Sequence, residues 1–162
     1  MRHGPAEDFS STGRDADRAL TPSGRDRVRD VARALVEADE APNVILTSPL
    51  VRARETAEIV AAVTKLESRG GKVETSLDVA PGGDGASLVR ELLKAKKKRA
   101  MIVGHEPDLS ALVYHFTQKR VEMLKAMVVG ISMTDEGTRL RFVLDPKSLG
   151  VERSPESRRS RE

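Results

Sequence analysis

Three short stretches of the chain hold side chains that bind anions or act as nucleophiles. They are Arg2-His3-Gly4, then Ser48, Arg52 and Arg54 after one apolar run, and Gly104-His105-Glu106 after another. The rigid guanidinium of arginine suits bidentate binding of phosphate oxygens, and a neutral imidazole is a nucleophile near pH 7. A glycine directly after a nucleophile lets the backbone approach a tetrahedral anion. These residue types together indicate a site for a phosphate-like anion.

Alternating apolar patterns predict the elements that must position these stretches. Helices are predicted from Thr21 as N-cap and Pro22 onward, over 50–62, around 86–95 and from Pro107. Buried strands are predicted at 44–46 and 100–103, a half-exposed strand over 73–79, and a hairpin near 127–133 and 139–144. The alternation favours an α/β fold, a three-layer α/β/α sandwich with a mainly parallel central sheet. Ligands bind beyond the carboxyl ends of such strands, so the three stretches should meet at one edge, provided that the N-terminal residues join the sheet.

The length and composition favour one soluble domain. We expect a single domain over 1–150 and a charged, disordered tail over 151–162. The absence of cysteine excludes disulfides, thiolate metal sites and cysteine nucleophiles. No signal peptide and no apolar run near the length of a membrane span is apparent, so no membrane association and a cytoplasmic location are expected. A net charge of +3, three Phe, one Tyr and no Trp give little support to nucleic-acid binding.

The chain resembles the histidine phosphatase superfamily, and in particular its SixA-like phosphohistidine phosphatase branch. The resemblance rests on four sequence blocks that stand in the family's order and spacing over about two thirds of the chain. They are R-H-G at 2–4, R-x-L-T-P-x-G at 18–24, S-P-x-x-R-A-x-x-T-A at 48–57 and V-G-H-x-P at 103–107. The resemblance implies a phosphoglycerate mutase-like fold.

The same resemblance implies a mechanism and a set of site residues. His3 would attack phosphorus and become phosphohistidine, and water would then release inorganic phosphate. Arg2, Arg52 and His105 would hold the phosphoryl oxygens together with His3 and Gly4. Fixed cationic donors suit a loose phosphoryl transition state, and neither a cofactor nor a metal is expected.

The identity of a general acid stays open at the level of the sequence. Family members that cleave phosphate esters use a Glu or Asp to protonate the leaving alcohol, and the candidates here are Asp84, in the loop 81–85, and Glu106. SixA-like enzymes lack an obvious acid. Phosphohistidine leaves as an imidazole that can already be protonated, so an acid contributes less. This favours a phosphoramidate substrate.

Three other polar residues have weaker claims to a role. Arg18 is equally suited to contact substrate or to pair with a loop carboxylate such as Asp15 or Asp17. Arg54 does not share a helix face with Arg52 and is expected at the surface. His115, beside the apolar face of its helix, is expected to be structural.

The leading functional hypothesis is removal of phosphate from phosphohistidine on a signalling or phosphotransfer protein, because short connections leave the site open. A small-molecule phosphomonoesterase is the alternative, with a phosphorylated metabolite as substrate. A truncated, non-catalytic domain that binds phosphorylated proteins is a third reading. Family members carry a central apolar strand before R-H-G, whereas only Met1 precedes Arg2 here. We therefore expect the first strand to be truncated and the native start to lie upstream of Met1.

Overall fold

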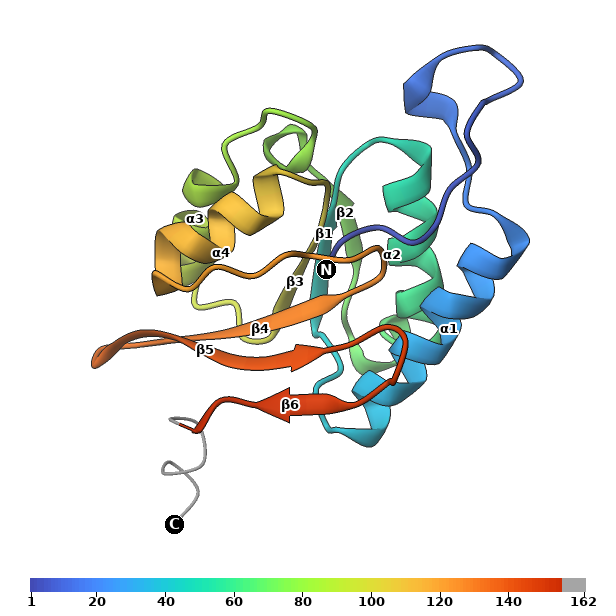
Figure 1. The fold of residues 1–162 in the computed structure, drawn as a ribbon. Coiled ribbons are helices and arrows are strands. Elements are labelled where there is room, and N and C mark those ends of the chain that lie inside the picture. The colour runs from blue at the N-terminus through green and yellow to red at the C-terminus, as the bar shows by residue number, and fades with distance from the viewer. Residues whose placement is uncertain (156–162) are drawn as a thin grey trace.

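The computed structural model describes residues 1–155 and places helices on both faces of a central sheet (Figure 1). The helices are α1 (Pro22–Glu37), α2 (Val51–Val63), α3 (Gly85–Lys94) and α4 (Asp108–Thr117). The strands are β1 (Val44–Thr47), β2 (Val73–Thr75), β3 (Ala100–Val103), β4 (Val128–Thr134), β5 (Gly137–Leu144) and β6 (Val151–Arg153). Helices α1 and α2 lie on one side and α3 and α4 on the other, so the predicted α/β class and layering are confirmed.

Strand β1 is the centre of a three-stranded parallel sheet in the order β2-β1-β3. Strands β4-β5-β6 form a second, antiparallel sheet, and we call the two the parallel and the antiparallel half. All four residues of β1 are buried, as a short apolar run predicts for a strand covered on both faces. Its register pairs Val44 with Ala100 and Thr47 with Val103. The carboxyl ends of β1 and β3 are therefore level, and the residues that follow them start from the same edge.

The first residues of the chain join this sheet at the edge of β3. The Met1 amino group donates to the carbonyl of Ile102 at 2.7 Å, and the Gly104 N–H donates to the carbonyl of Met1 at 3.1 Å. On the other side, the Arg2 N–H donates to the carbonyl of Met127 at 3.0 Å, just before β4. The segment forms only an isolated bridge, Arg2 with Gly104, but it links the two halves of the sheet. The N-terminal residues therefore join the sheet, which the predicted site required.

Strands β4, β5 and β6 form the antiparallel half, and the predicted hairpin of β4 and β5 is confirmed. The prediction of a disordered tail from residue 151 is wrong for its first residues, because Val151–Arg153 pair with β5 as β6. Long-range charge pairing supports this strand: Arg153 and Arg141 both donate to the buried carboxylate of Glu40, at 2.8 and 2.6 Å. The remainder of the predicted tail, 156–162, lies outside the described residues.

The predicted strand over 73–79 is wrong beyond Thr75. Residues Leu77–Val79 form a 3₁₀ turn whose start is capped by Ser76, with the Ser76 hydroxyl accepting from the Asp78 N–H at 3.2 Å. Alternating apolar residues indicated a strand, but Val79 is buried while Leu77 is 77% exposed. The turn leads the chain over the carboxyl end of the sheet, toward the site.

The first long helix begins as its sequence predicts. The Thr21 hydroxyl accepts from the Gly24 N–H at 2.9 Å and caps α1, whose buried face contains Val28, Val31 and Leu35.

No helix within residues 1–155 is both long enough and apolar enough to cross a membrane.

Candidate active site

The two histidines singled out by the sequence lie against each other beyond the end of β3. Their ring centroids are 5.2 Å apart, and the residues are only 7% (His3) and 4% (His105) exposed. The His3 N–H donates to the carbonyl of Gly104 at 3.1 Å, so the backbone of one histidine is bonded to the residue that precedes the other. The sheet itself thus brings positions 3 and 105 together.

Hydrogen bonding determines which nitrogen of His3 is free to react. Its Nδ1 lies 2.7 Å from the carbonyl oxygen of Gly4, which can only accept, so Nδ1 carries the proton and Nε2 keeps a lone pair. Burial lowers the pKa of His3 to about 4; the bond to Gly4 opposes this, while the nearby His105, Arg52 and Arg2 reinforce it. At neutral pH the ring is therefore uncharged, and Nε2 is the nitrogen that keeps a free lone pair.

Packing, more than approach to an anion, explains the glycine after His3. A Cβ at Gly4 would stand 2.6 Å from the Cγ2 of Val28 on α1, and Val28 is fully buried. The Gly4 N–H donates to the Thr56 hydroxyl at 3.0 Å, and that hydroxyl donates to the carbonyl of Arg52 at 2.7 Å. The segment that follows His3 is thus held between α1 and α2.

Of the two predicted phosphate-binding arginines, Arg52 is buried and Arg2 is half-buried, and both retain unused donors. Arg52, in the first turn of α2, donates from Nη1 and Nη2 to the backbone carbonyl and the carboxylate of Asp15, at 3.0 and 3.1 Å. Arg2 donates from Nη1 to the carbonyl of Met123 at 2.9 Å. Within the described chain, the Nε atoms of both arginines are buried and have no hydrogen-bond partner. Both guanidiniums lower the pKa of both imidazoles, so all four groups are within electrostatic reach.

His105 has one engaged and one unengaged ring nitrogen. Its Nε2 lies 2.8 Å from the Ser48 hydroxyl, whereas Nδ1 is buried and has no partner among residues 1–155. Burial lowers the pKa of His105 to about 4, and the charge of Arg52 adds to this effect, while Asp108 and Asp15 oppose it. The ring is therefore neutral at pH 7. Sequence reasoning placed Ser48 after β1 but assigned it no role.

Of the two roles considered for Arg18, its contacts show the pairing with a loop carboxylate. Its Nε donates to the carboxylate of Asp15 at 2.9 Å and its Nη1 to the carbonyl of Glu7 at 2.9 Å. Because Asp15 also contacts Arg52, one largely exposed carboxylate joins two guanidiniums. The sequence had considered Asp15 only as a partner for Arg18. Arg54 is exposed, as predicted.

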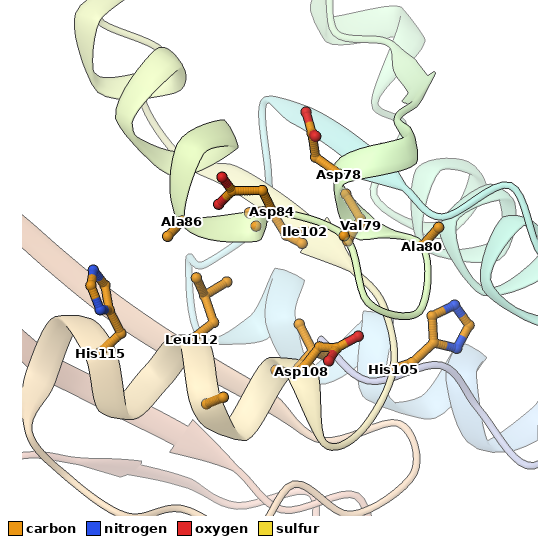
Figure 2. A pocket seen from close by; sticks show the side chains of 14 residues that line it. Asp78, Val79, Ala80, Asp84, Ala86, Ile102, His105, Asp108, Leu112 and His115 are labelled. Carbon is orange, nitrogen blue, oxygen red and sulfur yellow. The ribbon is translucent and has the colours of Figure 1, made fainter.

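A pocket of about 310 Å³ adjoins His105 and contains one of the two candidate acids (Figure 2). Asp84 lines it together with Asp78 and Asp108, but the Asp84 carboxylate caps α3 by accepting from the Ser87 N–H at 2.9 Å. In Figure 2 the Asp84 carboxylate points away from His105, whereas that of Asp108 points toward it.

Glu106 does not line this pocket. Its carboxylate accepts from both the backbone N–H, at 2.9 Å, and the hydroxyl of Ser110 in the first turn of α4. The adjacency to His105 that suggested Glu106 as an acid therefore reflects helix capping.

Comparisons with known proteins identify the family and the fold. Residues 1–72 match the family model of the histidine phosphatase superfamily (branch 1). An uncharacterised protein of Picosynechococcus sp. is 34% identical over 138 residues, which cover 81% of each chain.

Among solved structures, the protein histidine phosphatase SixA complexed with tungstate superposes with a TM-score of 0.83 at 22% identity, over 93% of this chain and 97% of that one. The alpha-ribazole phosphatase from Shigella flexneri gives a TM-score of 0.67 at 18% identity, over 94% and 97%. The fold is thus the phosphoglycerate mutase-like fold of SixA. From the family match and the relative that shares a third of its residues, the chain belongs to the histidine phosphatase superfamily.

Proposed function

We propose that this protein is a phosphatase in which His3 becomes transiently phosphorylated. One observation carries the proposal. Of the four buried side-chain nitrogen or oxygen atoms without a partner in the described chain, three are Nε of Arg2, Nε of Arg52 and Nδ1 of His105. Buried polar groups in native proteins are nearly always hydrogen-bonded, so three such atoms on the groups that influence His3 support a site for an anion.

The chemistry follows from the protonation state of His3. Its Nε2 lone pair attacks phosphorus, the Nε2–P bond forms, and the bond from phosphorus to the leaving group breaks. The positive charge that develops on the ring is stabilised by the Nδ1–H donated to the Gly4 carbonyl. Water then attacks phosphorus, the Nε2–P bond breaks, and inorganic phosphate leaves. Arg2 and Arg52 hold the phosphoryl oxygens throughout by fixed, charge-assisted hydrogen bonds.

For the substrate we propose phosphohistidine on another protein. Neither candidate acid is placed to protonate an alcohol, since Glu106 is bonded to Ser110 and Asp84 caps α3. An imidazole leaving group has less need of an acid. In addition, Leu77 is a large apolar side chain that is 77% exposed, and it lies in the 3₁₀ turn Leu77–Val79, whose Val79 lines the pocket beside His105. Exposed apolar groups beside a site suit a protein surface.

Trapping the intermediate tests the catalytic proposal. The protein would be mixed with a ³²P-labelled phosphohistidine phosphotransfer protein and quenched in base, and the chain would be examined for acid-labile, base-stable phosphate. We expect label on the parent and on His115→Gln, and none on His3→Gln. His115 is the matched control because it lines the outer part of the same pocket, where its ring contacts Arg90. If no substrate is turned over and His3→Gln still binds phosphate, the chain is a binding domain and the proposal is wrong.

Substrate class is tested by comparing rates. We expect kcat/KM on the phosphohistidine protein to exceed that on sugar and nucleotide phosphates, and Leu77→Ser to lower only the rate on the protein. Faster turnover of the small phosphate esters, unaffected by Leu77→Ser, would identify a small-molecule phosphomonoesterase instead.

A further inference from the structure

A fully buried hydrogen bond joins Ser48 to His105 across the parallel half of the sheet. Ser48 is 0% exposed, and its hydroxyl lies 2.8 Å from Nε2 of His105. The Ser48 backbone is itself held, because its N–H donates to the carbonyl of Val103 at 3.1 Å. The hydroxyl is therefore placed by the register between β1 and β3.

The direction of this hydrogen bond follows from the other partner of the hydroxyl. Leu50 directly precedes α2, and its N–H donates to the Ser48 hydroxyl oxygen at 3.2 Å. This bond uses one lone pair of that oxygen. The hydroxyl proton then needs an acceptor, and the Nε2 lone pair of His105 supplies one. In the reverse arrangement, Nε2–H would donate to Ser48 and the buried hydroxyl proton would have no acceptor among the described residues. Such an unsatisfied buried donor costs free energy.

We propose that Ser48 is a positioning residue that donates to Nε2 of His105 and thereby holds the neutral ring in its Nδ1–H tautomer. The Nδ1–H is buried without a protein partner, and it donates to an oxygen of the phosphoryl group. This inference rests on the proposed function, because it assigns the anion of that same site as the partner of Nδ1.

The tautomer matters because it decides whether His105 attracts or repels the anion. With the proton on Nε2, the Nδ1 lone pair would face negatively charged oxygens. The charged or titratable groups that influence the His105 ring are His3, Arg2, Arg52, Asp108 and Asp15. Burial among them keeps the ring neutral at pH 7, so the ring does not gain a donor simply by protonation. A hydrogen bond from Ser48 to Nε2 is the remaining way to keep the proton, and so a donor, on Nδ1.

The tautomer is directly measurable by ¹⁵N NMR of the histidine side chains at pH 7, with His105→Gln used to assign the signals. In the parent we expect Nδ1 of His105 to be the protonated nitrogen and Nε2 the unprotonated one. Ser48→Ala should shift this population toward Nε2–H and lower kcat roughly 10- to 100-fold with a smaller change in KM. Ser48→Thr, which retains a hydroxyl, should restore part of both.

A neighbouring buried hydroxyl provides the matched control. Thr47 is also buried, but its hydroxyl donates to the carbonyl of Ser48 at 3.1 Å and does not contact His105. Thr47→Val should therefore leave the tautomer of His105 unchanged, even if it alters stability. An equal shift in Thr47→Val and Ser48→Ala would reduce the role of Ser48 to general packing and overturn the inference.

Titration with inorganic phosphate separates this inference from the proposed function. If both hold, phosphate perturbs the signals of His3 and the Nδ1 signal of His105. If phosphate perturbs neither ring, the anion site and the proposed function fail together. If His3 responds but Nδ1 of His105 does not, or if the parent already has the Nε2–H tautomer, the inference alone is refuted. The parent measurement keeps the test valid even if Ser48→Ala does not fold.

Discussion

The cost of charging the buried His3 gives a prediction about stability. Its imidazole is held at a pKa of about 4, against 6.5 for the unperturbed side chain. Between these values the unfolded chain binds a proton at this position and the folded chain does not. The part of the free energy of unfolding that depends on His3 is therefore fully present above pH 6.5. It is lost as the pH falls toward 4, because protonation of His3 favours the unfolded state.

The magnitude follows from the size of the shift. Each unit of pKa difference corresponds to about 1.4 kcal/mol, so the free energy of unfolding should fall by roughly 3 kcal/mol between pH 6.5 and pH 4 on account of His3 alone. This is a large part of the stability of a typical domain, which is about 5–15 kcal/mol. Carboxylates also titrate in this range, so the informative quantity is the difference between the parent and a variant without this imidazole.

Urea unfolding in phosphate-free buffers from pH 7.5 to pH 4 measures that difference. The free energy of unfolding of the parent should fall more steeply than that of His3→Gln, by about 1.4 kcal/mol per pH unit below pH 6.5. His115→Gln, which removes an exposed imidazole, should follow the parent. If the parent and His3→Gln give parallel curves, His3 is not held neutral by its surroundings, and the argument for a neutral nucleophile fails.

Three further changes have defined outcomes. Arg52→Lys keeps the charge but loses the fork of donors, so kcat/KM should fall about 10²- to 10³-fold in steady-state assays. Asp15→Asn removes the carboxylate that competes with the proposed anion for Arg52, so inhibition by phosphate should strengthen roughly twofold to fivefold; weaker inhibition would show that Asp15 instead orients Arg52. Gly4→Ala should cost about 1–3 kcal/mol in urea unfolding through its clash with Val28, and Val28→Ala in the same chain should recover part of the loss.

The sequence already contained the order of most elements and the place of His105 at the edge of the sheet. Thr21 begins a helix because a hydroxyl next to Pro22 can cap it, and residues 44–46 form a strand because a short apolar run must be covered on both faces. His105 follows a parallel strand directly, so its place at the edge of the sheet was a consequence of strand order. Such features depend on neighbours within a few residues, where pattern and propensity act.

The hydrogen bonds that tune the site were decided by the tertiary structure. Ser48 and His105 are 57 positions apart, and their contact depends on the register of β1 with β3 and on the start of α2. The Asp15 carboxylate reaches Arg52 because the loop 7–18 folds back over α2, and no periodic pattern encodes a loop path. Glu106 faces Ser110, so its nearness to His105 along the chain was misleading. Which polar atom meets which depends on distances of a few tenths of an ångström between segments that are remote in sequence, and only the folded chain sets those distances.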